Sequence, residues 1–346
     1  MLWGTESSRI QLGCNLDIMQ KMPAECIDLV YTDPPFFTKR KYKDIHQTRG
    51  FDDSREYFES QSKTGAKGLN AYMEWLEIRL REMHRLLKPT GSFYLHLDWH
   101  AVHYAKVMCD KIFGYNNFKN EIIWKRKHGG NCTGKYRRYG TATDSILFYT
   151  KSGQNKKGYT YNQQFLKLQG KQLKKYKYDD KDGRGPYCLN KIISPSFGKH
   201  GQYTYKGRKP HPNGWSLKLE TMQRYESEGI LHFPEDKNRQ IKKKTHLNTH
   251  KGVPINNLWT DINIVSGNAK DKVHYPTQKP VALLERIVLT SSNEGDTVFD
   301  PFMGCGTAMV AAKKLGRKYQ GIDINPEAMR LAQQRLDKIL PVKRPT

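Results

Sequence analysis

The chain has 346 residues with 37% hydrophobic, 27% charged and 11% aromatic content, and its 59 Lys and Arg against 34 Asp and Glu give a formal net charge of +25. This composition excludes a disordered chain and a membrane protein, and the lack of a signal-peptide pattern or of an apolar run near the roughly 20 residues that cross a bilayer predicts a cytoplasmic protein. So much positive charge repels itself unless an anionic partner offsets it, so nucleic acid is the expected partner and a membrane is not.

The residues before 150 predict alternating strands and helices. An apolar run over 27–32 is typical of a buried strand, which ends at Asp33-Pro34-Pro35 because proline lacks a backbone donor. Residues 71–88 place apolar side chains on one face of a helix, and Lys88-Pro89 ends it. Further strands are expected over 92–97, 121–124 and 145–149, with a helix over 100–113.

A basic segment then interrupts the pattern. From Lys151 to Gly252, 23 Lys and Arg stand against 8 Asp and Glu, so the segment carries +15 of the net charge, together with twelve aromatic residues. Basic and aromatic side chains interleaved in this way are typical of a nucleic-acid surface. The alternation resumes with a helix over 281–290, a strand over 297–300, a tight turn at Gly304-Cys305-Gly306, a helix to about 315, a strand over 319–324 and a helix over 326–340.

Strands that alternate with helices predict an α/β fold: a Rossmann-like, doubly wound and mostly parallel sheet, here with the basic segment inserted as a recognition region. The six cysteines form no CxxC pair and the histidines show no ligand spacing. We therefore expect reduced thiols and no metal site.

One motif joins the strand over 297–300 to its turn. The sequence Asp300-Pro301-Phe302-Met303-Gly304-Cys305-Gly306-Thr307 lets the backbone approach a ligand, and Asp323 at the tip of the next strand can accept hydrogen bonds from ribose hydroxyls. The dinucleotide pattern G-x-G-x-x-G needs a third glycine where Met309 stands, which disfavours a pyrophosphate and an NAD-linked oxidoreductase. A nucleoside cofactor without phosphate, such as S-adenosylmethionine, fits better than NAD.

A second motif, Asp33-Pro34-Pro35-Phe36, follows the strand over 27–32. Two prolines fix the backbone, so the Asp33 carboxylate and the Pro34 carbonyl can accept hydrogen bonds from one amino group, and Phe36 offers a ring on which a planar base can stack. Two acceptors draw an exocyclic amino nitrogen towards tetrahedral geometry and free its lone pair for attack. Taken alone, such a tetrapeptide can also be a simple turn at the end of a strand.

These motifs resemble those of the amino-methylating DNA methyltransferases, which carry [DNS]-P-P-[YFW] and D-P-F-x-G-x-G-T and transfer a methyl group from S-adenosylmethionine to adenine N6 or cytosine N4. The catalytic motif precedes the cofactor motif, as in the circularly permuted beta class of that family. The segment 274–280, HYPTQKP, is similar to the H-x-P-T-Q-K-P of the family, and Trp259-Thr260-Asp261 resembles its W-x-D. The resemblance covers roughly residues 10–150 and 253–340.

The resemblance implies that Asp33, Pro34, Pro35 and Phe36 hold the target base. It implies a cofactor site made of Asp300, Phe302, Gly304, Gly306, Thr307, Asp323, Thr277, Gln278, Lys279 and Asn15. The charge of Lys279 suits the carboxylate at the methionine end of the cofactor. The family often has Gly-Asp before the catalytic strand, where this chain has Gly13-Cys14-Asn15. Either Asn15 or Asp17 takes the contact with the cofactor adenine, or the contact is absent.

The same resemblance divides the chain into residues 1–150 as the catalytic half of the methyltransferase domain, 151–252 as the target-recognition insert and 253–346 as the cofactor-binding half. Turning a base out of duplex DNA costs a few kcal/mol, which basic contacts to phosphates can offset. Besides the insert, the residues expected on the DNA face are Lys125, Arg126, Lys127, Arg137 and Arg138. A homodimer and a cognate restriction endonuclease are further partners that the resemblance suggests, as is association with the nucleoid in a bacterium.

The expected activity is therefore site-specific methylation of adenine N6 in duplex DNA after base flipping, since Asp at the first motif position goes mostly with adenine in the family. Cytosine N4 stays open as the alternative, because the two amino groups present similar hydrogens. A methyltransferase for RNA or protein is a further alternative, and a DNA-binding protein without activity is disfavoured by the two intact motifs.

Overall fold

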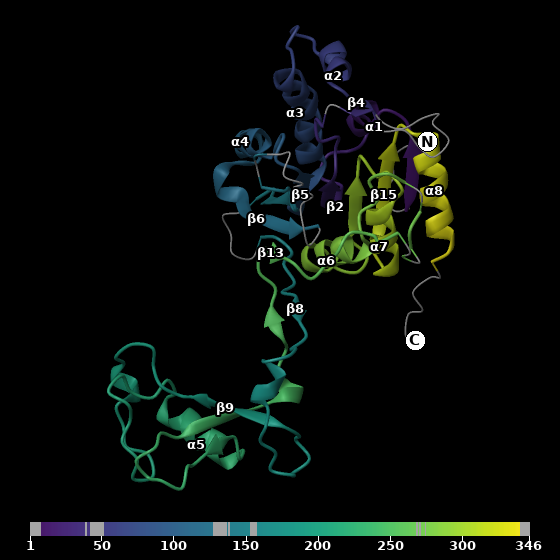
Figure 1. The fold of residues 1–346 in the computed structure, drawn as a ribbon. Helices are drawn as coiled ribbons and strands as arrows, with labels where there is room; N and C mark the ends of the chain where they lie inside the picture. The colour runs from purple at the N-terminus through teal and green to yellow at the C-terminus, as the bar shows by residue number, and fades with distance from the viewer. Residues whose placement is uncertain are drawn as a thin grey trace. The chain divides into compact units, whose positions relative to one another are not determined.

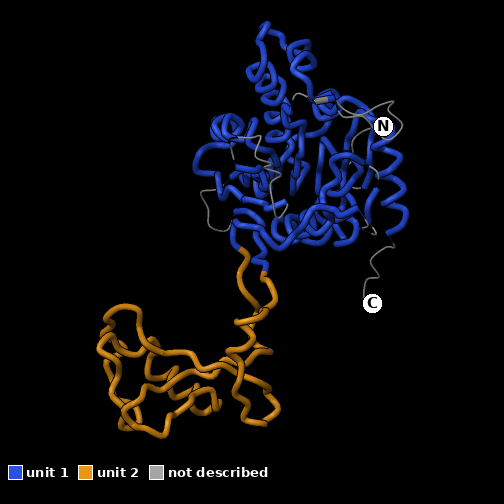
Figure 2. Tube along the Cα trace, viewed as in Figure 1, with its two compact units in different colours: residues 1–164, 256–346 blue, residues 165–255 orange. Residues whose placement is uncertain are grey.

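The computed structural model describes residues 8–38, 40–41, 52–126, 137, 139–152, 158–267, 269, 271–273 and 275–339. The chain divides into two compact units (Figure 2), one made of Met1–Gln164 with Asn256–Thr346 and the other of Phe165–Ile255. Lys127 and Arg138, two of the residues expected on the DNA face, and His274 of the HYPTQKP segment lie outside the described residues. No helix in the described part of the chain is long and apolar enough to cross a membrane.

The larger unit is built on an eight-stranded sheet with the order β1-β15-β14-β2-β5-β7-β6-β13 (Figure 1). Neighbouring strands run parallel except β7, which is antiparallel to both β5 and β6. The sequence prediction of a mostly parallel sheet is confirmed. The strands are β1 (Arg9–Leu12), β2 (Ile27–Thr32), β5 (Leu87–Leu97), β6 (Phe118–Lys125), β7 (Thr143–Thr150), β13 (Leu258–Trp259), β14 (Thr297–Asp300) and β15 (Lys318–Asp323).

Two sets of helices pack on this sheet. Helix α3 contacts α1, α2 and α4, while α7 contacts α6 and α8. Strand β14 is buried along its whole length, as is typical of a central strand covered on both faces. The helices are α1 (Asn15–Gln20), α2 (Arg55–Gln61), α3 (Leu69–Leu86), α4 (Val102–Phe113), α6 (Val281–Ser291), α7 (Thr307–Lys314) and α8 (Pro326–Asp337).

The centre of the sheet joins the two halves of the sequence. Phe299 of β14 is in register with Val30 of β2, and Asp300 is in register with Gly321 of β15. Because the three strands are parallel, their carboxyl ends meet at one edge of the sheet. The strand ends that carry Asp33, Asp300 and Asp323 are therefore neighbours.

Several boundaries differ from the sequence prediction. Helix α3 ends at Leu86, and β5 begins directly at Leu87 rather than at residue 92, so Pro89 lies inside the strand. The register between β2 and β5 shifts at this point, so that Pro89 falls where no ladder hydrogen bond is required of it. Strand β1 and the short helices α1 and α2 were not predicted, because four to seven residues carry too little periodicity.

The smaller unit has its own hydrophobic core, formed by Ile192, Tyr205, Trp215, Met222, Leu231 and Ile241. Its antiparallel sheet has the order β10-β11-β9, and Lys242 of β11 is in register with Lys191 of β9 and with His232 of β10. Its elements are β8 (Phe165–Leu166), β9 (Tyr187–Lys191), α5 (Leu219–Ser227), β10 (Leu231–His232), β11 (Lys242–His246) and β12 (Val253–Pro254). The remaining short elements are β3 (Arg40–Lys41), β4 (Asp52–Asp53) and the 3-10 turns Tyr115–Asn117, Leu173–Lys175, Lys199–Gly201 and Leu247–Thr249.

Candidate functional site

A cavity of about 460 Å³ lies in the larger unit where β2, β14 and β15 end. All but one of the residues that the sequence placed at a base or cofactor site line it, the exception being Gly306. The lining residues among them are Asp33, Pro34, Pro35, Phe36, Asn15, Thr277, Gln278, Lys279, Asp300, Phe302, Gly304, Thr307 and Asp323. The structure therefore brings the two motifs, far apart in sequence, to one cavity.

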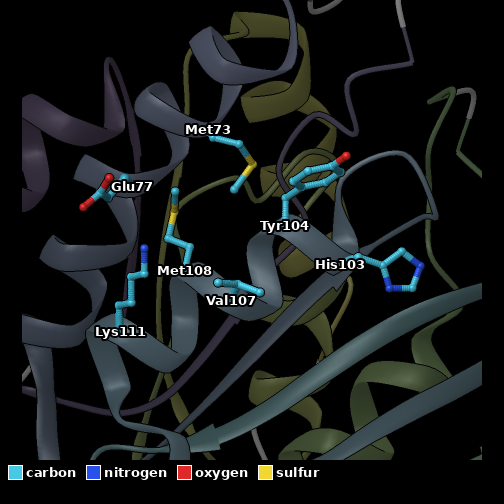
Figure 3. A pocket seen from close by; sticks show the side chains of 7 residues that line it. All are labelled: Met73, Glu77, His103, Tyr104, Val107, Met108 and Lys111. Atoms are coloured by element: carbon cyan, nitrogen blue, oxygen red, sulfur yellow. The ribbon is translucent and has the colours of Figure 1, made fainter.

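A second cavity of about 430 Å³ lies between α3 and α4 (Figure 3) and contains none of the motif residues. It is lined by Met73, Glu77, His103, Tyr104, Val107, Met108 and Lys111. The cavity at the strand ends is therefore the candidate site.

The turn after β14 depends on its glycines. Gly304 and Gly306 have φ values of +51° and +74°, which favour glycine. A Cβ on Gly304 would lie 3.1 Å from the ring of Tyr275, and one on Gly306 would lie 2.7 Å from the Cβ of Ala332. The backbone thus passes closer to its neighbours than a side chain would allow, with Gly304 facing the cavity.

Two carboxylates hold the shape of this turn. Asp300 accepts a hydrogen bond from the N–H of Phe302 at 3.0 Å, and Asp323 accepts one from the N–H of Gly304 at 2.8 Å. Burial raises the pKa of both carboxyl groups, that of Asp300 well above its usual range, and the nearby Asp33 charge adds to the effect at Asp300. Each carboxyl group is therefore held in place by a backbone donor within a poorly solvated wall.

The Asp33 carboxylate lies deep in the cavity. Its Oδ1 atom is buried and accepts no hydrogen bond from any described residue, while its Oδ2 atom receives the ammonium of Lys279. The Lys279 Nζ atom also lies 5.2 Å from the centroid of the Phe36 ring. Lys279, which the sequence placed at the methionine end of a cofactor, thus contacts the tetrapeptide directly in this structure.

Further residues that the sequence did not indicate fix the backbone after the tetrapeptide. Phe37 has a φ of +60°, unusual for a residue with a side chain. The two oxygens of the buried Asp53 accept hydrogen bonds from the N–H groups of Phe37 and Thr38, both at 2.7 Å, and the Tyr72 hydroxyl donates to the Pro35 carbonyl at 2.8 Å. Nothing in a polar stretch of sequence distinguishes Asp53 from an exposed acid.

Three buried polar side chains, Tyr31, His96 and Asp144, form a hydrogen-bonded series that packs against Phe36. The Tyr31 hydroxyl lies 2.8 Å from Nδ1 of His96, and His96 Nε2 lies 3.2 Å from Oδ2 of Asp144. The ring of His96 packs on Phe36 with centroids 5.8 Å apart. Burial alone would raise the pKa of Asp144, but the His96 hydrogen bond and nearby positive charges, Arg126 among them, lower it below its usual value.

Both polar atoms of the Asn15 side chain form a hydrogen bond within the cavity wall. Its Nδ2 atom donates to the Pro301 carbonyl at 3.0 Å, and its Oδ1 atom accepts from Nε of Arg79 at 3.0 Å. The buried Arg79 guanidinium also lies 4.0 Å above the ring of Trp75, and burial lowers its pKa. Asp17, the other residue considered for the cofactor adenine, is exposed and is not among the lining residues.

The residues expected on the DNA face are placed only in part. Lys125 and Arg126 lie at the end of β6, and Arg137 is exposed. The Arg126 Nε atom is 3.1 Å from Oδ1 of Asp144, so this guanidinium is already in an ion pair. The described residues contain no group of three or more His, Cys, Asp or Glu side chains that could hold a metal ion.

Comparisons with known proteins point to one family. The family model described as DNA methylase, N6_N4_Mtase, matches residues 27–334. The type II methyltransferase M.EcaI of Enterobacter cloacae is 29% identical over 298 residues, which cover 85% of this chain and 61% of M.EcaI. The DNA adenine methyltransferase YhdJ of Escherichia coli strain K12 is 27% identical over 335 residues, which cover 97% of this chain and 84% of YhdJ.

Among solved structures, the PvuII DNA methyltransferase, described as cytosine-N4-specific, matches with a TM-score of 0.50 and 16% identity over 99% of this chain and 90% of that chain. This likeness concerns the fold. The chain spans about three fifths of the length of M.EcaI.

Proposed function

The chain belongs to the N6/N4 DNA methylase family, and from this premise we propose that it transfers a methyl group from S-adenosylmethionine to the exocyclic N6 amino group of adenine in duplex DNA. The observation that carries the proposal is the position of Asp33, whose buried Oδ1 atom accepts no hydrogen bond from a described residue and faces the same cavity as Gly304 and Asp323. A buried acceptor without a donor is costly unless a ligand supplies the donor.

The target base is the ligand that completes this site. In the proposed arrangement the Asp33 carboxylate and the Pro34 carbonyl accept the two hydrogens of the amino group, and Phe36 stacks on the base. This polarises the nitrogen lone pair towards attack, so the residues act by positioning and electrostatics without a covalent nucleophile. The hydrogen bonds to the Phe37 and Thr38 N–H groups keep the tetrapeptide in place.

The cavity residues fit S-adenosylmethionine. Asp323 is a half-buried carboxylate beside the Gly304 turn and suits two ribose hydroxyls, while the Gly304 and Gly306 turn admits a close backbone approach. Thr277, Gln278 and Lys279 line the same cavity and suit the methionine end. When bound, this cofactor supplies an electrophilic methyl group on a sulfonium. Because both polar atoms of Asn15 bond to the cavity wall and Asp17 is exposed outside the lining, we propose that neither side chain supplies the contact with the cofactor adenine.

The choice of adenine rests on Asp33 at the first position of the motif and on the similarity to a DNA adenine methyltransferase over nearly the whole chain. The alternative is cytosine N4, which a cytosine-N4-specific enzyme of the same fold keeps open.

We propose that the smaller unit supplies phosphate contacts through one face of its sheet. Residues opposite each other in an antiparallel pair share a face, so Lys191, Lys242 and His232 gather there. No described carboxylate forms an ion pair with Lys191 or Lys242, and burial together with the Lys244 and Lys242 charges lowers the pKa of His232. Like charges placed opposite each other are destabilising, which DNA phosphates would relieve.

Three finer points belong to the proposal. Since a relative is named a type II methyltransferase, we propose a restriction endonuclease of the same sequence specificity as a functional partner. We propose a homodimer as the solution state, which light scattering after gel filtration can test. Acting on DNA, the protein would work in the cytoplasm, on the nucleoid if it is bacterial.

The decisive experiment incubates the full chain with methyl-labelled S-adenosylmethionine and, in separate arms, duplex DNA, RNA and protein. The DNA is then digested to nucleosides. The proposal expects label in N6-methyladenine, with none after Asp33→Ala although that variant still shifts DNA on a gel. Label in N4-methylcytosine would select the alternative, label only in RNA or protein would overturn the substrate, and near-normal transfer by Asp33→Ala would overturn the chemistry.

A further inference from the structure

Lys279 contacts the same two residues, Asp33 and Phe36, to which the proposed function assigns the target base. Its ammonium contacts Asp33 Oδ2 and lies 5.2 Å from the centroid of the Phe36 ring. These are the two groups expected to hold the amino group and the ring of the flipped base. The lysine and aspartate side chains are 12% and 15% exposed, so the pair is largely shielded from water. The Asp33 carboxylate and the Phe36 ring can therefore hold either the ammonium or the base, although the ammonium is on Oδ2 and leaves Oδ1 open.

Methyl transfer and this ion pair exclude each other for a physical reason. As the amino nitrogen attacks, it gains positive charge, and Asp33 stabilises that charge only if its own charge is not already neutralised. An ammonium at the same carboxylate would also repel the developing charge, and this repulsion is strong in a poorly solvated cavity. Lys279 must therefore leave Asp33 before the base can be held for reaction.

The cavity also offers Lys279 a second partner. Residues 277–279 line it together with Gly304 and Asp323, so the ammonium lies in the space that a nucleoside cofactor with an amino-acid end would share. The other buried cation of the wall is fixed: Arg79 bonds to Asn15 and to the Trp75 carbonyl. Lys279, by contrast, has Asp33 as its one ion-pair partner and the Phe36 ring as its one cation-π partner among the residues that the structure describes.

We propose that Lys279 is a positioning residue that blocks the target-base site of the free protein. When cofactor binds, the Lys279 ammonium leaves the Asp33 carboxylate and pairs with the carboxylate of the cofactor, which opens the site. The inference rests on the proposed function and adds to it an order of events. Cofactor and flipped base then bind with positive coupling, because the first removes the competitor of the second. A cofactor analogue without the carboxylate gives no such coupling.

The test uses the full chain and an unmethylated duplex that contains the sequence on which the protein acts. A 2-aminopurine stands beside the target adenine, and the fluorescence of the 2-aminopurine rises when that adenine leaves the stack. Two cofactor analogues are compared: S-adenosylhomocysteine, which has the carboxylate, and methylthioadenosine, which lacks it. We expect S-adenosylhomocysteine to increase the flipped fraction of the wild-type complex about tenfold and methylthioadenosine to leave it nearly unchanged.

The variant Lys279→Met should flip the base without any analogue and show no further response, while it binds S-adenosylhomocysteine about tenfold more weakly by calorimetry. Lys279→Arg keeps the charge and should keep the increase in base flipping on addition of S-adenosylhomocysteine. Lys272→Met, an exposed lysine of the same segment, is the matched control. If Lys279→Met does not fold, the comparison of the two analogues on the wild-type protein is sufficient to test the inference.

Equal flipping with both analogues, or a wild-type response from Lys279→Met, would overturn the inference while methylation of the DNA by wild type leaves the proposed function standing. Failure of wild type to methylate DNA at all would overturn the proposed function instead.

Discussion

Asp53 accepts a hydrogen bond from the backbone N–H of Phe37 at 2.7 Å and thereby holds the residue after the tetrapeptide Asp33-Pro34-Pro35-Phe36 in a left-handed conformation, with φ at +60°. Such a conformation costs on the order of 1–3 kcal/mol for a residue with a side chain and persists only where the surroundings enforce it. The second oxygen of Asp53 accepts from the N–H of Thr38. One buried carboxylate therefore sets the path of the chain on leaving the site.

We expect Asp53→Ala to lower kcat for methyl transfer about 10- to 100-fold, because it removes the carboxylate that accepts hydrogen bonds from the Phe37 and Thr38 N–H groups, a loss of about 1–3 kcal/mol. Cofactor affinity, measured by calorimetry, should change less than about twofold, since the Gly304 turn is not touched. Glu56→Gln, an exposed acid on α2, serves as the control. A variant with wild-type kcat would show that the tetrapeptide holds its shape alone.

Asp300 should make stability depend on pH. Burial raises its pKa in the folded protein well above the usual value, so the folded state binds this proton more tightly than the unfolded state does. Its stabilising contribution is complete below the unfolded pKa of about 3.9 and is lost as the pH rises through the folded pKa. We expect Asp300→Asn to gain unfolding free energy relative to wild type as the pH rises above the unfolded pKa of about 3.9, as urea titrations at each pH would measure. A constant difference between the two proteins would contradict this.

The turn after β14 can be probed with a matched pair of glycines. Gly306 and Gly295 both have positive φ, at +74° and +84°, but a Cβ on Gly306 meets Ala332 at 2.7 Å, whereas one on Gly295 meets nothing within 4 Å. Each alanine substitution should lower the free energy of unfolding by about 1–2 kcal/mol because of the positive φ. Gly306→Ala should lower it by about 1–3 kcal/mol more through overpacking. Urea unfolding gives both values, and equal losses would mean that α8 yields to the added methyl group.

His96 should be needed for stability as well as for the site. His96→Leu leaves the Tyr31 hydroxyl and the Asp144 carboxylate buried without their partner, so we expect a loss of about 3 kcal/mol in unfolding free energy. His103→Leu, on the exposed face of α4, should change stability by about 0.5 kcal/mol or less. Similar losses from the two substitutions would argue against a stabilising role for the hydrogen bonds of His96 to Tyr31 and Asp144.

The sequence predicted those parts of the fold that depend on local patterns. The strands ending at Asp33 and Asp300 carry their own stop signals, a proline pair and a glycine turn, and β14 begins and ends where predicted. The shared cavity followed from the rule that parallel strands end at one edge. Strand β1 was missed because its pairing with β15 decides its structure, and its own four residues do not.

The partners of the site residues were beyond the sequence for a related reason. Asn15 and Pro301 are 286 residues apart, and Lys279 and Asp33 are 246 apart. No local pattern encodes which distant group a polar side chain meets, so the resemblance of residues 274–280 and the charge of Lys279 predicted a cofactor contact but not the contact with Asp33. Asp53 and His96 belong to the same class, since their importance comes from burial among residues of other elements.

The pairing of β14 with β2 has a consequence for synthesis on the ribosome. The Thr297 N–H donates to the Asp28 carboxylate across 269 residues of sequence, and β14 closes the gap between the first strands and β15. During synthesis, residues 165–255 leave the ribosome before β14 and can form their own core first. The edge of β2 that pairs with β14 stays unpaired and apolar until β14 has left the ribosome. Translation of the intervening segment is thus the period in which the newly made protein is most exposed to aggregation and most dependent on chaperones.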